Sequence, residues 1–243
     1  MSDQKVLVKF LPATHPALIT VEVAWKKEVR YPESKFHVTS LLSSFTKLGS
    51  LGGLTGKLEL PGEAMMTMEK QLIDDTRGEW CIVLSNVDIH AITTLYNVIV
   101  FSHLNLDPFK HALIQSTVSA ESLLEVPSGV TPNLPFVAQI TVNSDEVSIS
   151  VEFASQMLEV ECKKVESLLL SWAYITAAGG FENNIWTVRR PLLVPNDDPY
   201  WIGTEVWLHL EDCAFSETAF DSLVNGLCGV HSHICPINRV EIQ

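Results

Sequence analysis

Four potential metal ligands lie close together near the C-terminal end of the chain. They follow the pattern Cys228-x-x-His231-x-His233-x-Cys235. Zinc binds cysteine and histidine at short spacings of this kind. In an extended segment, His231, His233 and Cys235 would share one side. The competing interpretation is structural, because a cysteine at a helix end is often a small core residue. The sequence therefore names four candidate ligands without deciding whether a metal binds.

The loop from Arg189 to Gly203 combines residue types that are enriched in protein-binding hot spots, aromatic side chains and arginine. The candidate interaction residues are Arg189, Arg190, Asp197, Asp198, Tyr200 and Trp201. The matching segment of the first half, Pro61 to Arg77, holds methionines instead. The competing interpretation is that both segments close the ends of a sheet. Both interpretations stay open at this point.

Paired carboxylates occur twice, as Asp74-Asp75 and Asp197-Asp198. Such pairs can bind a hard cation or transfer protons. A turn is the favoured interpretation, because aspartate side chains bond back to their own backbone. The chain has no nucleophile-elbow, zinc-protease, dinucleotide-binding or kinase signature. The sequence thus leaves enzymatic activity undecided and predicts no cofactor.

Composition excludes several classes of protein. The 243 residues carry 16 basic and 29 acidic side chains, a net charge of −13, which disfavours nucleic acid and anionic membrane as partners. A hydrophobic content of 47% excludes a disordered chain. No apolar run reaches the ~18 residues that span a bilayer. The N-terminus lacks a signal-peptide pattern, and the five scattered cysteines favour reduced thiols, so we expect a cytoplasmic protein.

The two halves of the chain share sequence similarities in the same order. Val38–Phe45 aligns with Val165–Trp172, and Gly52-Gly53 aligns with Gly179-Gly180, at a shift of about 127 residues. At nearly the same shift, further similarities pair Ile19–Ala24 with Ile149–Ala154, Trp80 with Trp207, Ala91–Ile99 with Ala219–Leu227, and His103 with His231. A tandem duplication explains the common order, whereas chance similarity of two amphipathic patterns is the alternative.

Each half predicts the order strand, strand, helix, strand, strand, helix, strand. In the first half the expected ranges are 6–10, 18–25, 37–50, 57–60, 80–84, 88–102 and 109–115. In the second half the strands are expected at 136–142, 147–153, 185–188, 206–210 and 237–242. The first helix of this half should end at Gly179-Gly180, and the second should begin after Ser216, because these residues suit helix ends.

Without its first strand, each unit has the βαββαβ order of ferredoxin-like folds. The predicted fold class is therefore α+β: a tandem duplication of a ferredoxin-like unit (βαββαβ plus an extra N-terminal strand), with two antiparallel sheets and helices on one face. We expect a first unit over 1–118, a linker over 119–135 and a second unit over 136–243. Two such units resemble a fused dimeric α+β barrel, in which two sheets pack face to face.

Charge differs between the halves. Residues 1–127 hold 11 basic and 14 acidic side chains (−3), and residues 128–243 hold 5 and 15 (−10). An acidic second unit favours a basic protein partner, although solubility alone would explain the charge. The first functional hypothesis is therefore a non-catalytic intracellular protein-interaction module that binds neither nucleic acid nor membrane. The sequence does not specify an oligomeric state.

The second hypothesis is a small-molecule-binding protein or an enzyme that uses a cavity between the two sheets. Ligand pockets need only a few polar groups on an apolar wall. The lining residues would be Trp80, Cys81, Trp207 and His209. A cavity of about 300 Å³ or more at that place would favour this hypothesis.

Overall fold

The protein is a mixed α+β fold with two separate five-stranded sheets. The computed structural model describes residues 6–26, 33–54, 66–73, 76–84, 89–106, 108–118, 134–141, 146–182, 198–210 and 216–243. These residues form ten strands, four α-helices and one short π-helical turn. Elements of the first sheet and its helices all lie between Val6 and Ser116, and those of the second lie between Val137 and Ile242.

Five strands and two helices make the first half of the structure. The strands are β1 (Val6–Phe10), β2 (Ala17–Trp25), β3 (Met66–Ile73), β4 (Arg77–Leu84) and β5 (Phe109–Ser116). The helices are α1 (Glu33–Ser50) and α2 (Ile89–Phe101), and α2 continues into the π-helical turn η1 (Ser102–Leu106).

The second half repeats this order of elements. Its strands are β6 (Val137–Ile140), β7 (Val147–Phe153), β8 (Tyr200–Ile202), β9 (Glu205–Leu210) and β10 (Ile237–Ile242). Its helices are α3 (Glu159–Ala177) and α4 (Glu217–His233).

Both sheets have the same strand arrangement. The first runs β1-β5-β2-β4-β3 and the second runs β6-β10-β7-β9-β8. In each, the last strand of the half inserts between the first two, which are antiparallel to each other. It therefore pairs in parallel with the edge strand, as β1 with β5 and β6 with β10. The prediction of purely antiparallel sheets is wrong at these two pairs.

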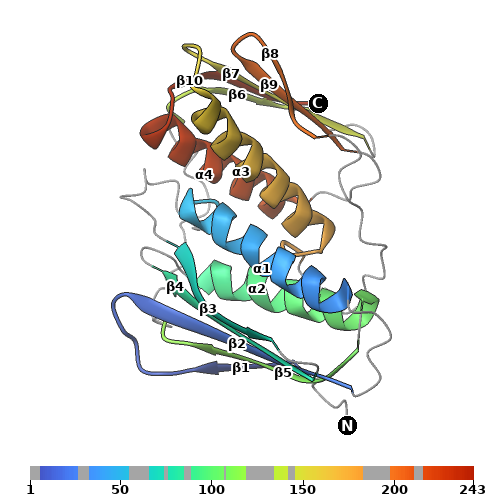
Figure 1. Ribbon diagram of the computed structural model, residues 1–243. Coiled ribbons are helices and arrows are strands. Elements are labelled where there is room, and N and C mark those ends of the chain that lie inside the picture. The colour runs from blue at the N-terminus through green and yellow to red at the C-terminus, as the bar shows by residue number, and fades with distance from the viewer. Residues whose placement is uncertain are drawn as a thin grey trace.

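The elements stack in four layers, with the sheets outside and the helices inside (Figure 1). Each sheet is covered by its two helices on one face, as predicted, and α1 packs against α3 across the middle of the molecule (Figure 1). The expected face-to-face packing of the sheets is wrong, because the helix layers separate them. The opposite face of each sheet is consequently an outer face of the molecule.

Helix boundaries agree with the local signals of the sequence. Ser216 caps α4, since its hydroxyl oxygen accepts a hydrogen bond from the backbone N–H of Ala219 at 3.2 Å. Gly52 and Gly179 follow α1 and α3 with positive φ angles of 85° and 66°. Glycine adopts this left-handed conformation without a Cβ penalty, which explains why both helices end there.

In β4 and β9, alignment of the two halves by residue type differs by one residue from their alignment in the structure. The Trp25 N–H donates to the Thr76 carbonyl in the first sheet, and the Phe153 N–H donates to the Thr204 carbonyl at the corresponding place in the second. Trp80, four residues after Thr76, therefore corresponds to Leu208 and not to Trp207. Since successive strand residues point to opposite faces, Trp80 is buried under the helices and Trp207 lies on the outer face.

Strands β3 and β8 lie in segments that the sequence predicted as loops. The strands expected at 57–60 and 185–188 fall outside the described residues. Tyr200–Ile202 instead forms a hairpin with β9, joined by Gly203 with a φ of 64°. Aromatic and β-branched residues on both sides of a tight turn favour this hairpin, and pairing with β9 supplies its ladder.

Reciprocal polar contacts join the two halves. The side-chain amide of Asn97 on α2 donates to the carbonyl oxygens of Gly180 and Glu182, at 3.0 and 2.8 Å. In the other direction, the Ser222 hydroxyl on α4 donates to the carbonyl of Gly53. The turn after the first helix of each half is thus held by the second helix of the other.

Candidate functional site

The outer face of the second sheet carries polar and aromatic side chains in rows across four strands. Outward residues follow from the alternation of buried and exposed positions in β7 and β9. Strand registers place the rows as Arg239, Glu152, Glu205 and Ile202; then Glu241, Ser150, Trp207 and Tyr200; then Ser148 and His209. Tyr200 and Ile202 are exposed, with relative accessibilities of 41% and 62%.

His209 is held at the centre of an aromatic cluster. Its Nδ1 is 2.7 Å from the Ser148 hydroxyl, and its Nε2 is 2.9 Å from the Tyr200 hydroxyl. Trp207 stacks beside the imidazole with ring centroids 6.1 Å apart. A Ser–His contact is an arrangement that can activate a nucleophile. Exposed aromatic residues such as Tyr200 are also a type enriched at protein interfaces.

Two glutamates face each other in the row beside this cluster. Glu152 on β7 and Glu205 on β9 are register partners on adjacent strands. Like charges directly opposite each other destabilise a sheet unless a cation lies between them. Arg239 is the register neighbour of Glu152 on β10, but its guanidinium pairs with Glu241. Within the described part of the chain, no cation is paired with Glu152 or Glu205.

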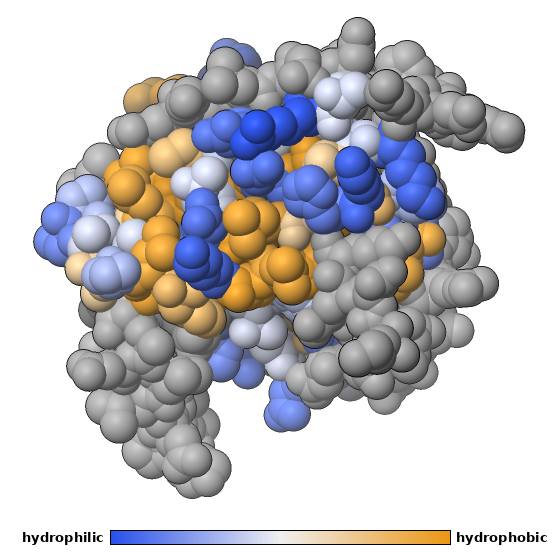
Figure 2. All heavy atoms as spheres, turned by 90° about the horizontal axis from the view of Figure 1, so that it is seen from below, coloured by the Kyte–Doolittle hydropathy of each residue, from blue (hydrophilic) through white to orange (hydrophobic). Residues whose placement is uncertain are grey.

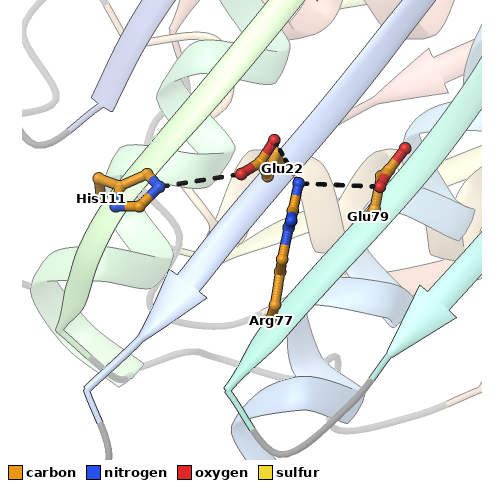
Figure 3. Close-up of polar contacts among 4 residues, drawn as sticks. All are labelled: Glu22, Arg77, Glu79 and His111. Atoms are coloured by element: carbon orange, nitrogen blue, oxygen red, sulfur yellow. Dashed lines mark ion pairs between the residues drawn. The ribbon is translucent and has the colours of Figure 1, made fainter.

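The first sheet also has two glutamates that are register partners, and here an arginine lies with them (Figure 3). Glu22 and Glu79 are register partners on β2 and β4. The Arg77 Nη2 atom lies 2.9 Å from Oε2 of Glu22 and 4.0 Å from Oε2 of Glu79, so one guanidinium forms ion pairs with both carboxylates. His111 Nε2 is 3.9 Å from the other oxygen of Glu22.

The two glutamate pairs do not occupy equivalent positions in their sheets. The Trp25 N–H donates to the Thr76 carbonyl and the Phe153 N–H donates to the Thr204 carbonyl, so these residues correspond to each other. The Glu152–Glu205 pair of the second sheet therefore lies where the first sheet pairs Ala24 with Arg77.

The outer face of the first sheet also carries several apolar side chains, beside polar ones such as Thr20 and Gln115. Leu7 and Leu18 are exposed at 49% and 39%, and outward-facing Val83 and Leu113 are half-buried. Figure 2, which views the molecule from this side, shows hydrophobic residues gathered in the middle of the face. The two outer faces thus differ in chemistry: the first carries an apolar patch beside an ion-pair group, and the second is aromatic and acidic.

Three of the six predicted interaction residues fall in the described part of the chain. Tyr200 lies on the outer face, whereas Trp201 points inward and packs against Phe153 at a centroid distance of 5.7 Å. The Trp201 indole donates to Glu166 at 2.7 Å. Asp198 is exposed before β8. Arg189, Arg190, Asp197 and the pair Asp74-Asp75 lie outside the described residues.

Glu152, Glu205, Trp207 and His209 belong to the candidate site, although sequence reasoning did not select the two glutamates. Glu152 is exposed, and Glu205 is half-buried. The available signal was the alternation in β7 and β9, which places every second residue outward. Only the register between those strands brings the two carboxylates together, and the sequence does not specify that register.

The four metal-ligand candidates have separate structural surroundings. His231 Nδ1 accepts the backbone N–H of Ile237 at 2.9 Å, and His103 accepts that of Phe109 at 2.8 Å in the first half. His233 is exposed, and the Cys235 thiol lies 3.5 Å from the Ser155 hydroxyl. Among the described residues, no group of three or more His, Cys, Asp or Glu could hold a metal ion.

Cys228 should be the least reactive of the described thiols. Burial in α4 raises the pKa of Cys228 to about 11. At pH 9 only about one molecule in a hundred would then carry the reactive thiolate. We expect iodoacetamide to leave Cys228 unmodified in the folded protein and to modify it after denaturation, as measured by peptide mass spectrometry. The half-buried Cys81 on the outer face is the internal control. Equal labelling of Cys228 in both states would contradict its burial.

The residues expected to line a cavity between the sheets do not share one space. Trp80 is buried in the first half, Cys81 lies on the outer face of that half, and Trp207 and His209 lie on the opposite side of the molecule. A cavity of about 410 Å³ lies instead between β1 and α2. Val8, Phe10 and Tyr96 contribute to its mostly apolar wall.

Comparison with known proteins adds no family assignment. No protein family matches the chain, and no curated protein matches it. A solved structure of complex III2 from Candida albicans, with Inz-5 bound, is 11% identical over 93% of this chain and 78% of that chain. Its TM-score is 0.21. Across the described residues, no helix is both long and apolar enough to cross a membrane.

Proposed function

We propose that the protein is a non-catalytic, intracellular interaction module that binds a basic partner protein through the outer face of its second sheet. The observation that carries this proposal is the Glu152–Glu205 pair, which has no paired cation among the described residues and adjoins the Tyr200–Trp207–His209 cluster. Carboxylates attract lysine and arginine, and aromatic rings stabilise their cationic groups. The charge of −10 over residues 128–243 would speed the approach of a basic surface.

The proposed location rests on the cysteines. Cys81, Cys162, Cys228 and Cys235 are free thiols, as expected in a reducing compartment.

We also propose that the chain arose by tandem duplication of a ferredoxin-like unit with an extra N-terminal strand. The identical strand arrangement supports this origin. So do the matching hydrogen bonds that His103 and His231 accept from the next strand, and the reciprocal contacts of Asn97 and Ser222. In this proposal the two outer faces diverged after duplication, and the second became the binding face.

The proposed function is tested with a fluorescent basic peptide of alternating arginine and serine. We expect fluorescence anisotropy to detect binding at low salt and a progressive loss of affinity as salt rises toward ~0.5 M. Tyr200→Ser should weaken binding at least about fivefold, because an exposed aromatic beside the carboxylates is a hot-spot residue type. Leu7→Ser is the matched control, since Leu7 is similarly exposed on the other sheet.

The result would count against the proposal in either of two cases. The first is no binding of the peptide even at ~20 mM salt. The second is loss of affinity in Leu7→Ser and not in Tyr200→Ser, which would show that the peptide binds the first sheet.

A further inference from the structure

We infer that the cavity between β1 and α2 is a binding site for a small, uncharged aromatic molecule. The cavity has a volume of about 410 Å³, and ligand pockets in proteins measure roughly 300–1,000 Å³. It belongs to the first half of the chain, whereas the proposed partner-binding face belongs to the second sheet. The inference is therefore independent of the proposed function and goes beyond it.

Alternate residues of an edge strand form one wall of this cavity. Val6, Val8 and Phe10 are spaced by two residues on β1, so their side chains share the face that α2 covers. Ile92 and Tyr96, one turn apart on α2, form the opposite wall. Val6 and Ile92 are buried, whereas Phe10 is 45% exposed. A bound ligand would consequently remove an aromatic ring from water, which favours binding of an apolar molecule.

Polar groups that would orient a ligand come from the free edge of β1. Among the described residues, β1 pairs with β5 alone. The backbone N–H of Leu11 donates to the carbonyl oxygen of Ser116, the last residue of β5, at 2.8 Å. Successive residues of a strand direct their N–H and C=O groups to alternate sides, so those of Val8 point away from β5, toward the free edge. A ligand hydroxyl or N–H can donate to this carbonyl beside the apolar wall.

The chemistry of the wall favours an uncharged ligand. The described lining residues are apolar or carry only a hydroxyl group, as Thr93 and Tyr96 do. Burying an ion without a partner costs much more free energy than burying a neutral group. The matching histidine bonds align α2 with α4, and the parallel strand pairs align β1 with β6. This alignment sets Asp221 in the place of Thr93 and Gln139 in the place of Leu7, so we expect one site per chain and not two.

The test uses two fluorescent probes that differ by one charged group, N-phenylnaphthylamine and anilinonaphthalene sulfonate. In fluorescence titrations of the full chain, we expect one molecule of the uncharged probe to bind per chain, at least about tenfold more tightly than the sulfonate. Phe10→Ser should weaken its binding at least about fivefold, because the variant removes apolar surface from the wall. Leu18→Ser is the matched control and should keep the affinity, since Leu18 is 39% exposed on the outer face of the same sheet and does not line the cavity.

A charge at the opening of the cavity gives an independent test. Thr93 is exposed on α2, so Thr93→Asp and Thr93→Asn should both stay folded. The aspartate should weaken binding of the uncharged probe at least about threefold, because the probe would take water from the carboxylate. Asparagine has nearly the same size without the charge and should keep the affinity within about twofold.

The inference would be overturned if the uncharged probe failed to saturate the chain, or if both probes bound equally well. Equal losses of affinity in Phe10→Ser and Leu18→Ser would place the probe on the outer face of the sheet. Unchanged affinity in both Phe10→Ser and Thr93→Asp would likewise show that the probe does not occupy the cavity.

Discussion

Replacing Gly229 with alanine is expected to lower the free energy of unfolding by about 2–3 kcal/mol. An added Cβ at this position of α4 would lie 2.1 Å from the carbonyl oxygen of Leu51, in the turn that follows α1. That oxygen belongs to the backbone, so it cannot rotate away as a flexible side chain could. Helix α4 would have to move away from the first half and lose contacts between the halves. Urea denaturation followed by tryptophan fluorescence measures the change.

Gly226, one turn earlier in α4, is the matched control. A Cβ there would meet a methyl group of Leu168 at 3.0 Å, and that methyl can shift. Alanine stabilises a helix by up to about 1 kcal/mol relative to glycine. We therefore expect Gly226→Ala to have about the same free energy of unfolding as the wild type, or a higher one. Equal stability of the two alanine variants would mean that α4 does not press against the 51–54 turn.

Strong local signals in the sequence predicted most of the helices and central strands. Alternating β-branched residues indicate β2 and β7, and Ser216 and Gly179 indicate helix ends. Local signals fail at β8, which has three residues and is a strand only because β9 pairs with it. Purely antiparallel sheets were also a wrong expectation, since β5 and β10 insert beside a distant first strand.

The arrangement of the two halves could not be predicted from one apolar stripe on each helix. In α3 the stripe that contains Leu168 and Trp172 is buried, but so are Ser171, Ala173 and Thr176. A helix buried over so much of its surface is covered on more than one side. Here α3 is covered by its own sheet and by α1, which places the helices between the sheets. The burial of small polar residues such as Ser171 and Thr176 cannot be predicted from their residue type.

The candidate site depends on strand register, which is a long-range property. Alignment of Trp80 with Trp207 is the natural choice by residue type, but the strand pairing sets Trp80 level with Leu208. A shift of one residue exchanges the two faces of a strand. The correct register is needed to recognise that Glu152 and Glu205 are cross-strand partners on the outer face.

Replacing Asn97 with aspartate is expected to cost about 3 kcal/mol of unfolding free energy at neutral pH. Asn97 is 5% exposed, and its amide group donates to the carbonyls of Gly180 and Glu182. A carboxylate has nearly the same shape but no donor, so it would leave both carbonyls without this partner and bury a charge against them. Asn97→Ala removes the donor without adding charge and should cost less, about 2 kcal/mol.

The pH dependence of Asn97→Asp separates lost hydrogen bonds from a change of shape. Burial beside two carbonyls should raise the pKa of the new carboxyl above its usual value of about 4 in the unfolded chain. A raised pKa in the folded state means that the penalty is smallest below the unfolded pKa and grows as the pH rises through the folded one. Denaturation curves at several pH values measure this, with exposed Asn238→Asp as the charge control. A penalty independent of pH, or an equal one in Asn238→Asp, would show that Asn97 does not join the two halves through its donors.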